Sequence, residues 1–117
     1  MAIVALQPAS INATIRRGQN QTFKSSAVLD FAGAAINMSG WDSYAAKLVA
    51  QSPSPNTADV SFGTVTGNAD GTLTLLYDAS DLASVPLGTA TLVITGVHVS
   101  GDDSQLLASG SAQLQEG

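Results

Sequence analysis

The sequence predicts an all-β fold: a single immunoglobulin-like β-sandwich of about seven antiparallel strands, with one short helical turn near Ala79–Ala83. Short segments alternate apolar and polar side chains, and turn residues separate them at intervals of roughly 8–14 residues. The segment Asn68–Thr95 carries the clearest pattern, which indicates a strand, a helical turn, a Pro-x-Gly corner and a second strand. The chain divides into an N-terminal arm over residues 1–10 and the sandwich over residues 11–117.

The first half of the chain predicts three strands. Ile11–Arg17 is the first, and a second follows the turn at Gly18–Asn20. Trp41–Ala50 is the third, with Trp41 in the core; helix is the competing interpretation, but Ser52-Pro-Ser-Pro55 follows directly. The side chains expected on the inward faces of the second and third strands are Phe23, Ser25, Ala27 and Leu29, then Tyr44, Ala46, Leu48 and Ala50.

The second half predicts four more strands. Val60 and Phe62 begin the fourth strand, and a bulge at Gly63 shifts its phase. Asp70-Gly71 is a turn that needs positive φ and leads into Thr72–Tyr77. Three further features are expected: a helical turn capped by Asp78-Ala-Ser-Asp81, a corner at Pro86-Leu-Gly88, and the strands Thr89–Ser100 and Gln105–Gln115.

The composition predicts an uncharged surface. Only 11% of the residues are charged, against roughly 25% in typical domains. The surface must therefore be built largely from Ser, Thr, Gln, Asn and Ala, and such a surface can pack against another protein without burying unpaired ions. The net charge of −5 argues against nucleic acid as a partner, because phosphate binding needs a basic stripe.

Other classes of function are excluded by what the sequence lacks. It has no cysteine, which rules out disulfides, thiolate zinc sites and a thiol nucleophile. Met1–Leu6 has no positive n-region, and no run approaches the ~18 apolar residues of a membrane span. We therefore expect a chain made in a cytoplasm, with no signal peptide, no membrane partner and no cofactor.

Several structural motifs resemble a known family, the small immunoglobulin-like domains of tailed-bacteriophage virion proteins. These include the N-terminal domains of baseplate upper proteins and domains associated with tail fibres. The resemblance covers about Ile15–Leu114, although the aromatic residue usual after Gly88 is absent. The matching segments are Arg17-Gly18 through Phe23, Asn37-Met-Ser-Gly40-Trp41, Tyr44–Leu48, Asp70-Gly71-Thr-Leu73-Thr-Leu75 with Leu82 and Pro86-Leu-Gly88, and Leu107–Leu114.

The resemblance implies a non-catalytic bacteriophage virion structural protein, located in the virion. It would act through protein–protein packing, either as a capsid decoration or accessory protein or as a tail or baseplate component. Its expected partners are other virion proteins, namely a major capsid or tail/baseplate protein, and copies of itself. The absence of a receptor-binding head slightly favours decoration, whereas the usual neighbours of the family favour the tail.

The N-terminal arm supplies the candidate interface. Its apolar run, Ala2–Leu6, suits addition of a strand to a neighbour's sheet edge, and pairing within its own domain is an equally good interpretation. The candidate interface residues are Ile3, Val4, Leu6, Arg16 and Arg17.

Residues that suggest chemistry have simpler structural explanations. His98 has no G-x-S-x-G elbow to serve, so we expect a solvent-facing strand histidine. Asp78 and Asp81 have the spacing of a carboxylate pair, but they also suit a helix cap. A calcium site from Asp70, Asp102 or Asp103 lacks the D-x-D-x-D-G spacing. We therefore expect no enzyme, no catalytic residue and no metal ligand.

The alternative from another class is a stand-alone adhesion or carbohydrate-binding β-sandwich module. Binding would then depend on the loops Gln51–Thr57 or Gly101–Ser104.

Overall fold

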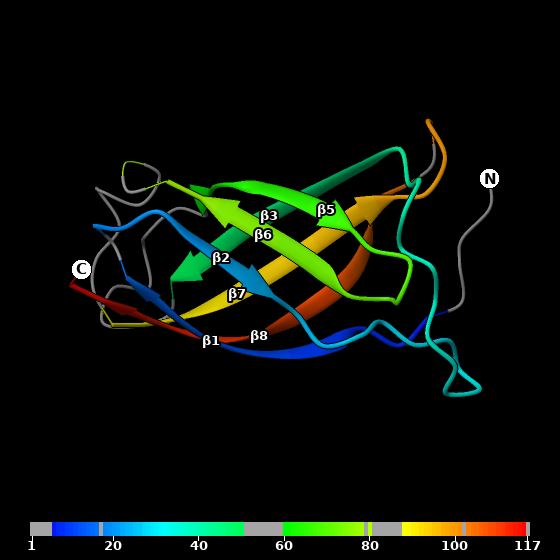
Figure 1. The fold of residues 1–117 in the computed structure, drawn as a ribbon, viewed down its shortest axis with the longest axis horizontal. Coiled ribbons are helices and arrows are strands. Elements are labelled where there is room, and N and C mark those ends of the chain that lie inside the picture. Colours follow the sequence, from blue (N-terminus) through cyan, green and yellow to red (C-terminus); the bar gives the residue numbers. More distant parts are fainter. Residues whose placement is uncertain are drawn as a thin grey trace.

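Two β-sheets pack face to face in the computed structural model (Figure 1). The structure describes residues 6–16, 18–50, 60–78, 80, 88–101 and 103–116. The strands are β1 (Ala9–Arg16), β2 (Gln21–Lys24), β3 (Ser43–Ala50), β4 (Val60–Ser61), β5 (Thr64–Gly67), β6 (Leu73–Tyr77), β7 (Gly88–Val97) and β8 (Gln105–Gln115).

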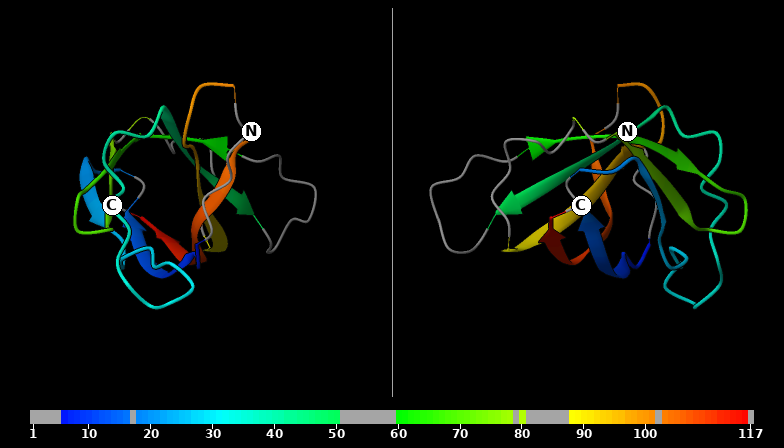
Figure 2. Two further views of the ribbon diagram at one scale, coloured as in Figure 1. Left: turned by 90° about the vertical axis from the view of Figure 1, so that its right-hand side faces the viewer. Right: turned by 60° about the vertical axis from the view of Figure 1, so that its left-hand side comes forward.

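The strand order is that of an immunoglobulin-like sandwich. The larger sheet runs β1-β8-β7-β3-β4 and the smaller sheet runs β2-β6-β5 (Figure 2). The predicted fold class, an all-β sandwich, is confirmed. One detail differs from the expected antiparallel strands: β1 lies beside β8 and runs parallel to it from Ala9 opposite Ala108 to Arg16 opposite Gln115.

The core lies between the two sheets and follows from the period-2 alternation of the strands. In β1 every second side chain is buried, beginning with Ala9 and ending with Ile15. In β6 the predicted inward residues Leu73, Leu75 and Tyr77 are all buried. Trp41 is buried as predicted, although β3 begins two residues later, at Ser43. The alternation therefore determines which face of each strand meets the other sheet.

The second strand is shorter than predicted and its alternation ends early. β2 ends at Lys24, and beyond Ser25 it is Val28, not Ala27 or Leu29, that is fully buried. Ser25 causes the change, because its hydroxyl accepts the backbone N–H of Leu73 and donates to the carbonyl of Ser26. The backbone N–H of Ser25 also bonds the carbonyl of Leu73 at 2.9 Å, and the next such bond runs from Val28 to Gly71 at 2.8 Å, so the phase of the chain shifts between Ser25 and Val28.

Gly63 does more than form the predicted bulge. It has φ 71° and separates β4, which pairs with β3 in the large sheet, from β5, which pairs with β6 in the small sheet. A Cβ at this position would lie 2.6 Å from the carbonyl oxygen of Leu76. The chain therefore crosses between sheets at a residue where only glycine fits without strain.

The other predicted turns and strands are largely reproduced. Gly71 has φ 91°, as the Asp70-Gly71 turn requires, and Gln105–Gln115 is β8 as predicted. The strand predicted over Thr89–Ser100 is β7, which ends at Val97. Residues 79 and 81–83 of the expected helical turn lie outside the described residues, as do the loop residues 51–59.

Candidate functional site

The outer face of the five-stranded sheet is the broadest candidate interaction surface, and we call it the large-sheet face. Residues paired across a sheet point to the same side, so the strand register defines its rows. One row carries Asn12, Ser111, Thr91 and Val49 across β1, β8, β7 and β3. The next row runs Ser10, Ser109, Val93, Lys47 and Ser61. Short hydroxyl, amide and valine side chains dominate both rows.

Charge is arranged unevenly between strands and turns. Every acidic residue in the described part of the chain lies outside the strands. Within the described strands the charged side chains are Arg16, Lys24 and Lys47, all of them basic. Lys24 lies 3.7 Å from the Asp70 carboxylate, and both side chains are exposed. The described strands therefore present no carboxylate on either outer face.

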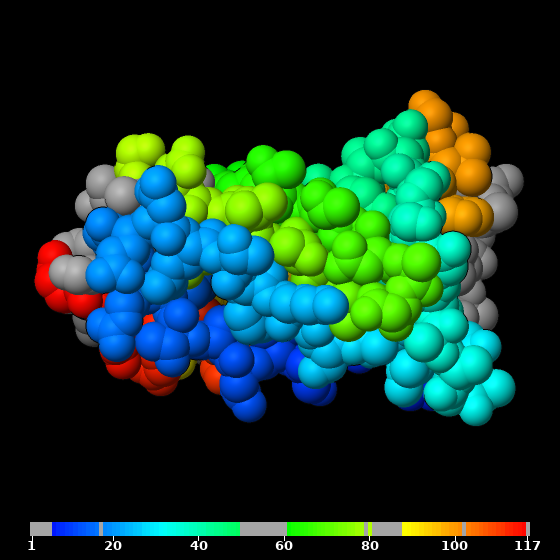
Figure 3. Space-filling view, in the orientation of Figure 1, coloured from blue at the N-terminus to red at the C-terminus, as the bar shows by residue number. Residues whose placement is uncertain are grey.

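The outer face of the three-stranded sheet, which we call the small-sheet face, is rich in threonine. Thr22, Leu76 and Thr64 form one row, and Lys24, Thr74 and Thr66 form the next. Leu76 is 49% exposed and lies between two threonines. Figure 3 shows this face, where the blue atoms of β2 lie beside the green atoms of β5 and β6.

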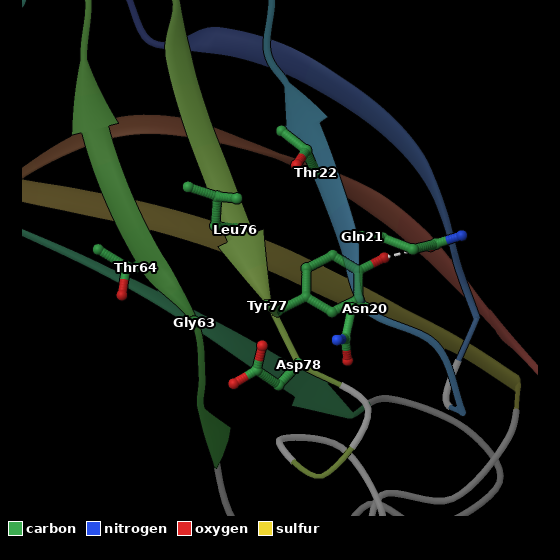
Figure 4. Close-up of a pocket in the computed structure, with 8 residues that line it drawn as sticks. All are labelled: Asn20, Gln21, Thr22, Gly63, Thr64, Leu76, Tyr77 and Asp78. Atoms are coloured by element: carbon green, nitrogen blue, oxygen red, sulfur yellow. Dashed lines mark hydrogen bonds between the residues drawn. The ribbon is translucent and has the colours of Figure 1, made fainter.

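A polar pocket lies at one end of the small-sheet face (Figure 4). Its volume is about 420 Å³, which is within the usual range of small-molecule sites. The lining comes from the start of β2, from Gly63 and the start of β5, and from the end of β6. The lining residues are Asn20, Gln21, Thr22, Gly63, Thr64, Leu76, Tyr77 and Asp78.

Tyr77 is held in the pocket wall by a hydrogen bond and by ring packing. Its hydroxyl donates to Oε1 of Gln21 at 2.6 Å, which joins the ends of β6 and β2. The ring packs edge-on against Phe62 with centroids 5.6 Å apart. Burial raises the pKa of Tyr77 above its ordinary value of 10.0, and a hydrogen bond with the Arg16 backbone opposes that shift. The phenol thus stays protonated at neutral pH and serves to fix the pocket wall.

The pocket is lined by groups that can hydrogen-bond a polar ligand. Its polar groups are amides, threonine hydroxyls, one phenol and the carboxylate of Asp78. The lining contains neither histidine nor lysine, and Asp78 is its one carboxylate. The amides, hydroxyls and carboxylate of this lining can hydrogen-bond a hydroxylated ligand.

The predicted interface residues fall into three groups. Ile3, Val4 and Arg17 lie outside the described residues. Leu6 is 8% exposed and belongs to the chain's own core, and Gln7 next to it bridges to Leu29. That burial leaves little of Leu6 for a partner. Arg16 is exposed at the end of β1.

His98 is not the solvent-facing strand residue that the sequence predicts. It follows the last residue of β7 and is half-buried, with its ring edge-on to Trp41 at a centroid distance of 4.9 Å. Its Nδ1 is buried and has no hydrogen-bond partner among the described residues. Ring packing against Trp41 therefore accounts for the place of His98 at the end of β7.

The aspartates with candidate chemical roles are dispersed. Asp70 lies in the β5–β6 turn, where its carboxylate accepts the hydroxyl of Thr72 at 2.6 Å and its backbone N–H at 3.1 Å. Those hydrogen bonds, with a smaller effect of Lys24, lower the pKa of Asp70. Asp78 lines the pocket, Asp103 is exposed before β8, and Asp81 and Asp102 lie outside the described residues. No group of three metal-binding side chains occurs within the described ranges.

Sequence reasoning missed the pocket because its walls come from three separate segments. One signal was present: Leu75-Leu76 breaks the apolar–polar alternation of β6, so that one leucine must face outward.

In the described part of the chain, no helix is long and apolar enough to cross a membrane.

Comparison with known proteins gives little guidance. No family model matches the sequence, and no curated protein matches it. Among solved structures, the endo-β-1,4-mannanase from Thermotoga petrophila is similar, with a TM-score of 0.44 and 12% sequence identity. The match covers 97% of this chain and 19% of the mannanase. At that similarity the mannanase carries no information about the activity of this chain.

Proposed function

We propose that this chain is a non-catalytic bacteriophage virion structural protein that works by packing against other proteins. It serves as a capsid decoration or accessory protein or as a tail or baseplate component, and its location is the virion. The observation that carries the proposal is the large-sheet face, with its rows of short uncharged side chains. The sequence motifs shared with phage immunoglobulin-like domains support the same role.

A partner that covers the large-sheet face must remove water from its side chains and restrict their motion. Burying an unpaired charge is costly, so a face without carboxylates is cheap to cover. Lys47 is the one charged residue in the two central rows. Short side chains also lose less conformational entropy on burial than lysine, glutamate or arginine. A partner that covers this face would therefore have few charges to desolvate.

A charge introduced on this face tests the proposal. Thr91→Lys places an ammonium in the centre of the large-sheet face, and Ser104→Lys places the same group in the exposed β7–β8 connection as a control. Particles assembled with each variant are purified, and the protein is quantified by mass spectrometry. We expect Thr91→Lys to reduce incorporation at least ~10-fold and Ser104→Lys to leave it unchanged. Equal incorporation of both variants would contradict packing through this face.

The polar pocket favours a second candidate function, a carbohydrate-binding module. Amide and hydroxyl groups beside the exposed Leu76 suit a neutral sugar. This function predicts saturable glycan binding by the purified protein. Thr64→Trp should fill the pocket and abolish that binding, whereas Thr66→Trp, on the same strand and face but outside the pocket lining, should not. A glycan array without a saturable ligand would eliminate this candidate.

A further inference from the structure

β1 is an open sheet edge. It pairs with β8 along one side over its whole length, and none of the described strands lies on its other side (Figures 1 and 2). An edge strand presents unpaired backbone N–H and C=O groups, which act as a template for another strand. β1 has eight residues, whereas the other edge strands are shorter: β2 and β5 have four each and β4 has two. It is therefore the longest edge of the described sandwich.

β1 carries few of the features that normally protect an edge. Natural sheets block edges with proline, lysine, bulges or very short strands. Pro8 precedes β1, and within Ala9–Arg16 there is no proline, no lysine and no break in the register with β8. Its one charged residue, Arg16, stands at its end. The hydroxyl of Ser111 on β8 donates to Oδ1 of Asn12 at 2.8 Å, which ties the edge to its neighbour.

The alternation of β1 makes it complementary to itself. Its inward side chains are buried and its outward ones are exposed at every second position. Two β1 strands can pair antiparallel about a two-fold axis that places Asn12 opposite Asn12 of the second copy, or Ala13 opposite Ala13. In both registers every inward residue lies opposite an inward one. About seven residues of each copy are paired in either register, whereas a slip of one residue would place isoleucine opposite polar groups.

Charge selects the antiparallel arrangement. In a parallel in-register pair the two Arg16 side chains would be adjacent, which is unfavourable. In the antiparallel pair they lie at least six residues apart along the strands, or about 20 Å, well beyond the Debye length of about 8 Å at physiological salt. The described acidic groups lie outside the strands, so none of them stands on the paired edge.

We propose that β1 of one copy pairs antiparallel with β1 of a second copy about a two-fold axis, joining the two five-stranded sheets into one. The inference deepens the proposed packing function by naming one of its partners, a second copy of this chain. Because each copy carries a net charge of −5, raising the salt concentration strengthens the association.

Sedimentation of the purified protein over a range of concentrations tests this dimer. Asn12→Lys puts like charges near the two-fold axis, and Ser111→Lys adds the same charge on the same face one strand further in. We expect a reversible dimer for the wild type. The dissociation constant of the dimer should rise at least ~10-fold for Asn12→Lys and change by less than ~3-fold for Ser111→Lys. A wild type that stays monomeric at every concentration, or equal weakening by both lysines, would overturn the proposal.

Single cysteines test the geometry, because the chain has none of its own. Directly paired residues have Cα atoms about 4.5–5.5 Å apart, which a disulfide can bridge. In the Asn12-centred register, Asn12→Cys should form a disulfide dimer under mild oxidation. In the Ala13-centred register, Asn12→Cys should instead cross-link with Thr14→Cys in a mixture. Ser111→Cys should form no disulfide in either register, and a lack of both expected cross-links would contradict the pairing.

A variant lacking residues 1–5 separates this inference from the N-terminal arm as the contact. If the truncation abolishes the dimer while Asn12→Lys retains it, the arm makes the contact and the β1 pairing is wrong. If the protein is monomeric in solution but is incorporated into particles, this inference fails while the proposed function stands. If the wild-type protein dimerises in solution but is absent from purified particles, the proposed function fails while this inference stands.

Discussion

Gly110 lets β1 dock closely on β8, and its replacement by alanine should loosen the edge strand. A Cβ at this position would collide with the carbonyl oxygen of Ile11, and the N and carbonyl C of Ile11 lie 2.7 Å from the same point. Real Cβ atoms do not tolerate such contacts with backbone, so Gly110→Ala must push β1 away from β8.

The magnitude follows from what β1 contributes. Overpacking typically costs about 1–3 kcal/mol. Complete release of β1 would expose Ile11 and Ile15, which are 3% and 1% exposed, at about 1.5–3 kcal/mol each. The strain is thus smaller than the cost of full release. We expect β1 to stay docked but strained, with a loss of about 1–3 kcal/mol in the free energy of unfolding.

Chemical denaturation and amide hydrogen exchange measure the two parts of this prediction. Gly110→Ala should lower the free energy of unfolding by that amount and speed exchange of the β1 amides by about 5- to 150-fold. Ser109→Ala, one residue away and adding no atom, should stay within about 0.5 kcal/mol of the wild type. A Gly110→Ala protein with wild-type stability and fully protected β1 amides would refute the reasoning.

Three further substitutions test the core and the turns by chemical denaturation. Leu92→Ala removes a fully buried side chain and should lower the free energy of unfolding by about 2–5 kcal/mol. Thr91→Ala, on the outer face, should lower it by less than about 1 kcal/mol. Similar losses for the two variants would contradict the assigned faces. Gly63→Ala must adopt φ 71° beside the Leu76 carbonyl and should cost about 1–3 kcal/mol, and an unchanged stability would show that the sheet crossing tolerates a side chain. The lowered pKa of Asp70 contributes stability that is present above its unfolded pKa of about 3.9 and is lost as the pH falls through the lower, folded value. The loss of unfolding free energy in Asp70→Asn should therefore be larger at pH 7 than at pH 3. An equal loss at both pH values would show that the charge of Asp70 does not contribute.

Local patterns were sufficient for much of the fold. The alternation in β6, the extent of β8 and the Asp70-Gly71 turn depend on neighbouring residues, and the structure reproduces them. The predicted length and inward residues of the second strand were wrong. The Ser25 hydroxyl bonds Leu73, a residue far along the chain, and a local pattern does not reveal that contact. The parallel pairing of β1 with β8 likewise joins the two ends of the chain, and no local signal predicts it.

The candidate surfaces were less predictable than the fold. Composition predicted an uncharged surface, but only the register shows that Thr91, Asn12 and Ser111 share one row. For the arm, an interface and pairing within its own domain were equally good interpretations; Leu6 is buried in the chain's own core, and Ile3 and Val4 lie outside the described residues. The roles of Gly63 and Gly110 depend on close approach of distant backbone, which a sequence pattern does not record.

Cryo-electron microscopy of the particle that carries this chain tests the central claim most directly. The account predicts density that fits the sandwich, with the large-sheet face in contact with another virion protein. A particle without such density, or one in which that face is open to solvent while other surfaces make every contact, would contradict it.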